Sequence, residues 1–128
     1  MDKENLNRLG GIILDSSMTV HKELGPGLLE SAYLLALARE LECRSIHFRM
    51  QVPVEFQYKG VALGKIYVMD LFVEEEIIIE IKSVETMHPI FKSQLITYLK
   101  LSDKKLGYLI NFNVTLLKDG FTRMVYHF

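Results

Sequence analysis

Residues 68–82 read VMDLFVEEEIIIEIK, and this stretch determines how the middle of the chain folds. Branched and aromatic residues on both sides of three consecutive glutamates are typical of two strands joined by an exposed turn. If Glu74–Glu76 form a three-residue hairpin loop, the strands are antiparallel and Asp70 faces Glu80 directly. A shift of one residue would send the two carboxylates to opposite faces of the sheet, so any function that they share depends on this register.

The second strand of this hairpin carries an apolar face and a charged face. Isoleucines occupy the odd positions from 77 to 81, whereas Glu80 and Lys82 project together from the other side. Charged groups are seldom buried unless they are paired or bind metal, and like charges that face each other repel. The Asp70–Glu80 pair therefore needs a cation, either the Lys82 ammonium or a divalent metal such as Mg²⁺. A solvated ion-pair network of the three residues explains the spacing equally well.

Hydrophobic periodicity predicts further elements on both sides of the hairpin. Apolar residues at helical spacing predict helices over residues 2–24, 29–41 and 89–101. From Phe48 to Tyr58 every even position is apolar, which predicts a half-buried strand with these side chains on one face. The predicted strands are 47–58, 61–73, 77–83, 106–112 and 121–128. The predicted fold class is α/β, as an α+β mixed sheet with helices flanking a central sheet.

Length and composition are those of an ordinary folded domain. The chain has 128 residues, 49% hydrophobic and 24% charged, so we expect one domain over residues 1–128. The net charge of −1 gives no large basic surplus, so any nucleic-acid site must be local. The apolar runs are too short to cross a membrane, and the single cysteine, Cys43, excludes an internal disulfide. With a polar N-terminus, these features predict a cytoplasmic protein.

Three motifs resemble those of known nucleases. Asp70 followed by Glu80-Ile81-Lys82 resembles the signature of the PD-(D/E)xK nuclease superfamily, which has an Asp near the end of one strand and a Glu-x-Lys on the next. Gln94-x-x-x-Tyr98 resembles the motif of the RecB and lambda-exonuclease branch. The stretch Gly27-x-x-Glu30-x-x-Tyr33 resembles the bacterial GxxExxY protein family, a branch of the same superfamily. The similarity covers nearly all of residues 20–125.

The resemblance implies a restriction-endonuclease-like fold with an αβββαβ core, which agrees with the predicted order of elements. Two positions depart from the family pattern. Phe91 stands where related sequences often carry a His, and Asn113 replaces a usual Gly.

The resemblance also implies catalytic and metal-binding roles. Asp70 and Glu80, with the backbone carbonyl of Ile81, would bind one or two Mg²⁺ ions, for which Mn²⁺ can substitute. Glu30 would complete the metal site. Lys82 would position or help to deprotonate the attacking water, or neutralise charge that develops at phosphorus. The predicted catalytic residues are thus Asp70, Glu80, Lys82 and Glu30.

The implied substrate-binding residues are Gln94, Tyr98 and Tyr33. Gln94 and Tyr98 share a helix face, where an amide and a phenol can hold a water, a phosphate oxygen or a base. A buried hydrogen-bonded pair between helix and sheet is equally compatible with their spacing. Glu30 also has an alternative, as a rim carboxylate favoured by the positive end of its helix.

The sequence therefore predicts a Mg²⁺-dependent nuclease that hydrolyses phosphodiester bonds in DNA, with RNA as the second choice. The alternative is a non-catalytic module that keeps the fold and binds nucleic acid or a protein. The intact set of Asp70, Glu80 and Lys82 favours the enzyme, whereas the near-neutral net charge favours the alternative. A homodimer that pools local lysines would reconcile an enzyme with the near-neutral net charge. Its contact would be an edge strand that carries three aromatic residues, Phe121, Tyr126 and Phe128.

Overall fold

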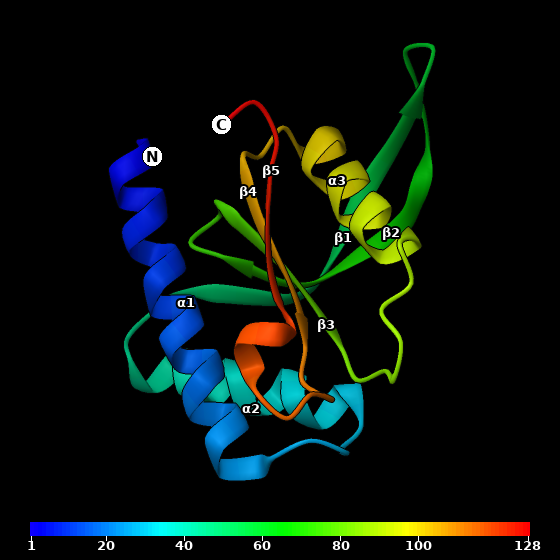
Figure 1. The fold of residues 1–128 in the computed structure, drawn as a ribbon. Helices are drawn as coiled ribbons and strands as arrows, with labels where there is room; N and C mark the ends of the chain where they lie inside the picture. Colours follow the sequence, from blue (N-terminus) through cyan, green and yellow to red (C-terminus); the bar gives the residue numbers. More distant parts are fainter.

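Two helices precede the sheet and a third connects two of its strands in the computed structural model, which describes residues 1–128. The elements are α1 (Lys3–Leu24), α2 (Glu30–Cys43), β1 (Phe48–Tyr58), β2 (Val61–Val73), β3 (Ile77–Lys82), α3 (Ile90–Ser102), β4 (Leu106–Asn111), a short 3-10 helix (Leu117–Asp119) and β5 (Phe121–Val125) (Figure 1). Each predicted helix and strand is confirmed to within a few residues. The segment from α2 to β4 has the predicted αβββαβ order.

The five strands form one mixed sheet in the order β1-β2-β3-β4-β5. β1 pairs with β2, β2 with β3 and β4 with β5 in antiparallel fashion, whereas β3 and β4 are parallel. Parallel neighbours need a crossover, and α3 provides it. The mixed sheet flanked by helices confirms the predicted fold class.

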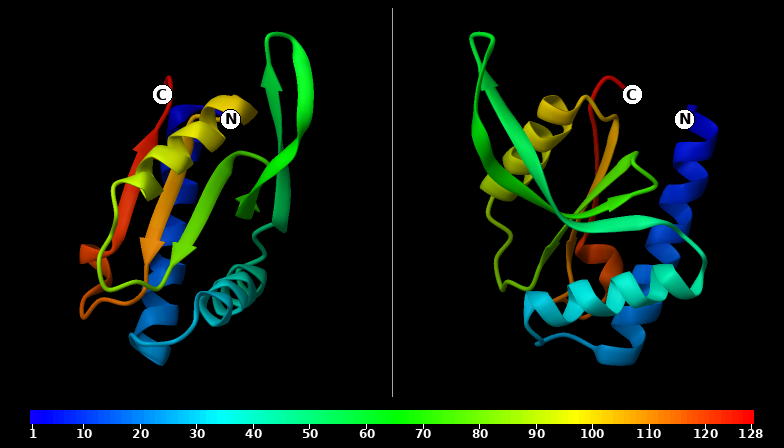
Figure 2. Two further views of the ribbon diagram at one scale, coloured as in Figure 1. Left: turned by 90° about the vertical axis from the view of Figure 1, so that its right-hand side faces the viewer. Right: turned by 180° about the vertical axis from the view of Figure 1, so that it is seen from behind.

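The sheet separates two hydrophobic cores. Ile77, Ile79 and Ile81 belong to the larger core, which contains buried residues of α1 and α2. Ile78 belongs to the smaller core, with Leu95 and other residues of α3. Figure 2 shows α3 on one side of the sheet and α1 and α2 on the other. β3 is therefore covered on both faces, so its charged residues lie on an interior strand between two apolar cores.

Strands β1 and β2 change the face that they present to the helices halfway along. Phe48 packs against the larger core, whereas Val52 belongs to the smaller one. On β2, Leu71 and Met69 are divided in the same way. The prediction that even residues from 48 to 58 share one face is therefore wrong. The left-handed backbone of Gln51, with φ of 54°, interrupts the alternation of β1 at this point.

Beyond this point β1 and β2 continue as a two-stranded arm that projects from the body of the molecule (Figure 1). The arm carries exposed apolar side chains, among them Tyr58, Val61, Leu63 and Ile66. Lys59 and Gly60 form its turn, both with positive φ, as a tight hairpin requires.

The C-terminal strand is shorter than predicted, because β5 ends at Val125. The aromatic side chains there are used within the chain: Phe121 and Phe128 pack against the larger core and Tyr126 against the smaller one. They are therefore not the exposed aromatic edge that the dimer prediction assumed. No helix is both long and apolar enough to cross a membrane.

Helix α1 begins and ends where its sequence predicts. The side chain of Asp2 accepts a hydrogen bond from the N–H of Asn5 and so caps the N-terminus. Gly25, with a φ of 69°, ends the helix. Between these ends α1 approaches the sheet closely at Gly10. A Cβ added to Gly10 would lie 2.0 Å from the hydroxyl oxygen of Tyr108, whose side chain is buried.

We expect Gly10→Ala to lower the free energy of unfolding by about 1–3 kcal/mol, because the new methyl group overpacks the α1–β4 contact. The neighbouring Gly11→Ala is the matched control, since no atom lies within 4 Å of its added Cβ. Alanine is the better helix former, so Gly11→Ala should stabilise the protein by up to about 1 kcal/mol. Urea denaturation of both variants measures the difference. Equal effects of the two substitutions would contradict the close approach.

Candidate active site

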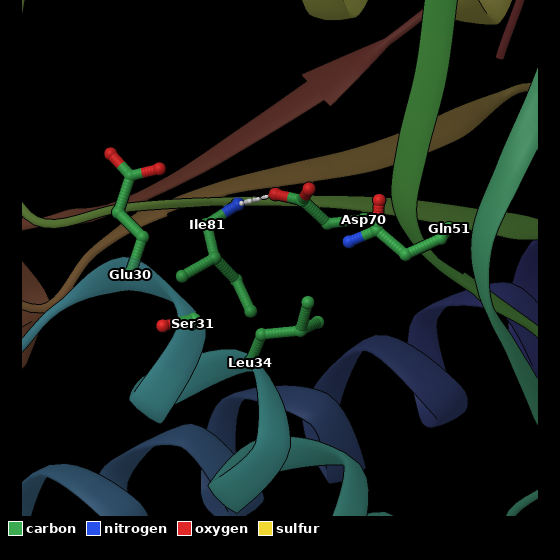
Figure 3. A pocket seen from close by; sticks show the side chains of 6 residues that line it. All are labelled: Glu30, Ser31, Leu34, Gln51, Asp70 and Ile81. Carbon is green, nitrogen blue, oxygen red and sulfur yellow. Dashed lines mark hydrogen bonds between the residues drawn. The ribbon is translucent and has the colours of Figure 1, made fainter.

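The β2–β3 hairpin brings Asp70 and Glu80 together at the point where its main-chain pairing ends. Leu71 lies opposite Ile79, which confirms the predicted register. One step further, Oδ2 of Asp70 accepts a hydrogen bond from the N–H of Ile81 at 2.7 Å (Figure 3). Oε1 of Glu80 accepts one from the N–H of Asp70 at 3.4 Å. Each carboxylate thus binds the backbone of the opposite strand, and the two are held side by side.

Glu80 is nearly buried, with 7% of its surface exposed. Burial, followed by the charge of the neighbouring Asp70, raises the pKa of Glu80 to about 9. Lys82 lowers this pKa, but its effect is the smallest. Glu80 therefore keeps its proton at neutral pH when no cation is bound. A cation at this position would favour the ionised carboxylate and displace the proton.

Lys82 lies near the carboxylates without pairing with them. It forms no salt bridge with Asp70 or Glu80. Its Nζ instead lies over the ring of Phe91, 4.4 Å from the ring centroid, where the aromatic face attracts the ammonium. The alternative of a solvated ion-pair network is therefore wrong, because Glu80 is buried and Lys82 forms no salt bridge with either carboxylate. Phe91, one of the two departures from the family pattern, is the residue that holds Lys82.

A cavity of about 290 Å³ opens beside Asp70. It is lined from α2 and from strands β1, β2 and β3, by Glu30, Ser31, Leu34, Gln51, Asp70 and Ile81 (Figure 3). Glu30 and Asp70 thus face one cavity although they come from elements far apart in the sequence. The first turn of α2 presents Glu30, whose Oε1 accepts a hydrogen bond from the N–H of Ser83 at 3.4 Å.

The oxygen atoms at Asp70 suit a small divalent ion. Mg²⁺ commonly uses one or two carboxylates and keeps several of its waters. Asp70 and Glu80 provide the carboxylates. The N–H and C=O of a strand residue project to the same side, so the carbonyl of Ile81 points towards β2 as its N–H does. No group of three His, Cys, Asp or Glu side chains is close enough to hold a metal, so Glu30 stands apart at the rim.

Comparison with known protein families matches residues 7–124 to the PD-(D/E)XK nuclease superfamily. The chain belongs to this superfamily. No curated protein and no solved structure matches it. The matched residues include both carboxylates, Lys82 and all five strands except the last residue of β5, and the mixed sheet with three helices is consistent with a restriction-endonuclease-like fold. Membership suggests a nucleic-acid substrate and a divalent metal, in agreement with the oxygen ligands at Asp70.

Tyr98 lies on the α3 side of the candidate site of this PD-(D/E)XK superfamily member. Burial raises its pKa to about 12, and the charges of Glu80 and Asp70 contribute, which places the phenol near the carboxylates. Its ring centroid is 5.6 Å from that of Tyr67. Gln94, one turn earlier, is exposed, and no side-chain hydrogen bond joins it to Tyr98. The alternative of a buried, hydrogen-bonded pair between helix and sheet is therefore wrong.

Tyr33 lies beneath the site and not in it. The side chain is fully buried and its ring stacks on Phe112, with centroids 4.5 Å apart. The hydroxyl donates a hydrogen bond to the carbonyl of Gly25 and accepts one from the N–H of Leu28 at 3.1 Å. The substrate contact implied for Tyr33 is therefore wrong for this structure, because its hydroxyl is engaged within the protein. Tyr33 instead fixes the turn that leads to Glu30.

Sequence reasoning missed two polar residues of this site, Asn111 and Gln51. Asn111 is 4% exposed and lies beside Lys82 in the β3–β4 register. Its amide donates to the carbonyl of Val84 and accepts from the N–H of the same residue, at 3.0 and 3.1 Å. The segment after β3 is thereby fixed. In the sequence, the sign of such a role is the polar Asn111 directly after the apolar residues 106–110. Gln51 lines the cavity with Asp70.

Proposed function

We propose that this superfamily member is a Mg²⁺-dependent nuclease that hydrolyses phosphodiester bonds in DNA, with RNA as the second candidate polymer. The observation that carries the proposal is the pairing of Asp70 with the buried Glu80, because neither carboxyl group forms a salt bridge with Lys82 and the pKa of Glu80 is raised to about 9. Two adjacent carboxylates in such surroundings are stabilised in their ionised form by a divalent cation. Mn²⁺ is expected to substitute for Mg²⁺.

The residues of the chain divide the chemical work. Asp70, Glu80 and the carbonyl of Ile81 would hold the ion, which when bound polarises a phosphate and makes a water more acidic. Lys82 would neutralise the negative charge that develops at phosphorus. Its side chain lies over a ring and is free of carboxylate partners, so no salt bridge must break first. Glu30, at the rim of the cavity, would hydrogen-bond water there.

Gln94 and Tyr98 would contact the nucleic acid from α3. The hydroxyl of Tyr98 and the carboxamide of Gln94 have no hydrogen-bond partner in the protein, so both can donate to a phosphate oxygen or a base. The buried ring of Tyr98 gives its hydroxyl a fixed position, whereas the exposed Gln94 is free to adapt. Tyr98 would therefore contact the nucleic acid beside the carboxylates, and Gln94 would contact it further along the nucleic-acid strand.

Several further assignments belong to the proposal. The Gly27-x-x-Glu30-x-x-Tyr33 motif supports membership of the bacterial GxxExxY branch. We propose one domain over residues 1–128 and a cytoplasmic location, because the composition is ordinary and Cys43 is the single cysteine. A homodimer is proposed through the backbone of β5, which is an edge strand of the sheet.

The test is a cleavage assay on linear DNA, circular DNA and RNA in the presence of Mg²⁺, with Asp70→Asn as the key variant. We expect the loss of this carboxylate to reduce cleavage by about 100-fold or more, because an amide cannot replace a charged metal ligand. Asp103→Asn is the control, since Asp103 is an exposed carboxylate at the end of α3 and its left-handed conformation suits asparagine. It should keep full activity.

Two outcomes would contradict the proposal. Cleavage that survives in Asp70→Asn at the wild-type rate would exclude Asp70 from the reaction. Binding of nucleic acid by a wild-type protein that cuts none of the three substrates, with either Mg²⁺ or Mn²⁺, would favour the non-catalytic module.

A further inference from the structure

Gln51 combines an unusual backbone with a position at the candidate site. Seven residues other than glycine have positive φ. Six of them lie in turns or just beyond the end of an element: Ser45, Lys59, Glu74, Glu75, Asp103 and His127. Gln51 alone has this conformation within a strand, with φ of 54°. Left-handed backbone costs free energy in any residue with a Cβ, and such strain is concentrated at functional sites.

The strain occurs directly opposite Asp70. In the β1–β2 register Met50 pairs with Leu71 and Val52 with Met69, so Gln51 and Asp70 are the positions between them. The faces of both strands change at this point, as the division of their residues between the two cores shows. The side chain of Gln51 consequently reaches the cavity that Asp70 lines (Figure 3).

The carboxamide of Gln51 adds two N–H donors to a cavity wall whose only other side-chain donor is the hydroxyl of Ser31. The other polar side chains on its wall are the carboxylates of Glu30 and Asp70 and the hydroxyl of Ser31. Carboxylates only accept hydrogen bonds and repel a phosphate, whereas an amide N–H donates without adding charge. Lys82 is not on this wall. Gln51 is exposed and its side chain makes no hydrogen bond within the protein, so its two N–H donors are available.

We propose that Gln51 binds the substrate by donating an amide hydrogen bond to a non-bridging phosphate oxygen of the nucleic acid beside Asp70. This inference rests on the proposed nuclease function and adds a residue to it. The left-handed backbone is the means by which β1 turns this side chain from the sheet face into the cavity. Glycine would relieve the strain at position 51, and glutamine there retains a donor at the expense of stability.

The experiment measures binding without cleavage. A fluorescein-labelled DNA duplex is titrated with protein and followed by fluorescence anisotropy, with Ca²⁺ in place of Mg²⁺ to suppress hydrolysis. The variants are Gln51→Leu and Gln51→Gly, with Gln57→Leu on the exposed arm as the matched control. Mn²⁺ affinity without DNA is measured by calorimetry, and thermal unfolding reports the fold.

We expect both Gln51 variants to weaken duplex binding by about tenfold, as the loss of a hydrogen bond to a charged group predicts. Gln57→Leu should bind as the wild type does. Mn²⁺ affinity should change by less than about twofold in every variant, because the side chain holds phosphate and not metal. Gln51→Gly should unfold at the wild-type temperature or above it, which separates lost binding from lost stability.

Three outcomes would overturn the inference. Duplex affinity within about twofold of wild type in both Gln51 variants would exclude the phosphate contact. A parallel fall in Mn²⁺ affinity would make Gln51 a metal ligand instead. A wild-type protein that binds neither the duplex nor Mn²⁺ would overturn the nuclease proposal itself, and this inference with it.

Discussion

Replacing Glu80 with glutamine is expected to abolish metal binding and cleavage while the metal-free fold remains intact. Burial and Asp70 raise the pKa of Glu80 to about 9, so at neutral pH the side chain is already uncharged without metal. Glutamine has the same shape and can still accept the hydrogen bond from the N–H of Asp70. The charge that a divalent ion needs is absent, and we expect its affinity to fall by about 100-fold or more.

Calorimetric titration of Mg²⁺ and Mn²⁺ into both proteins measures this effect, and a cleavage assay on the same preparations measures its consequence. Glu85→Gln is the control, because Glu85 is an exposed carboxylate shortly after β3 with no ion pair. Its affinity for metal should equal that of the wild type. Retention of wild-type metal affinity by Glu80→Gln would show that the site is not at these carboxylates.

The affinity for Mg²⁺ is expected to rise steeply with pH. Metal binding requires the ionised form of Glu80, so each ion that binds displaces a proton as long as the pH is below about 9. One displaced proton corresponds to about a tenfold gain in affinity for each pH unit, which predicts about a hundredfold gain between pH 6 and pH 8. Calorimetry in buffers of different ionisation enthalpy would measure both the affinity and the released proton. An affinity that is flat over this range would contradict the raised pKa.

The stability of the metal-free protein should fall as the pH rises, in contrast to its affinity for Mg²⁺. The pKa of Glu80 in the folded state, about 9, lies above its ordinary value of 4.5. Glu80 therefore contributes stability that is fully present below about pH 4.5 and is lost as the pH rises through about 9. Glu80→Gln removes this dependence, so its unfolding temperature should exceed that of the wild type increasingly towards pH 9. Parallel pH profiles of the two proteins would exclude Glu80 as the titrating group.

The local pattern was sufficient to predict how the two carboxylates of the candidate site are placed. The three glutamates at 74–76 and the apolar strands on either side defined a hairpin with one register, and that register placed Asp70 beside Glu80. The spacing of apolar residues predicted the strands and helices, because side-chain direction repeats every two residues in a strand and about every 3.6 in a helix. Tyr98 was singled out by the resemblance of Gln94-x-x-x-Tyr98 to a nuclease motif, and the structure places it on α3, which covers the charged face of β3.

Residues whose role depends on distant contacts were harder to predict. Lys82 has the same sequence neighbours whether it pairs with Glu80 or lies over Phe91, and the position of α3 decides between them. Tyr33 belongs to a motif, but its hydroxyl is used by the backbone of residues 25 and 28. In the sequence, Gln51 is an ordinary polar residue of a strand, because the neighbouring residues do not predict its left-handed conformation.

The order of the elements, the register of the central hairpin and the pairing of Asp70 with Glu80 follow from the amino-acid sequence alone, because these depend on spacing along one or two neighbouring strands. Three features depend on the packing of the whole chain: the burial that raises the pKa of Glu80, the position of Lys82 over Phe91, and the cavity shared by Glu30, Gln51 and Asp70. Burial, dielectric surroundings and cavity walls arise from elements far apart in the chain, and they exist only once α2, α3 and the sheet have packed together.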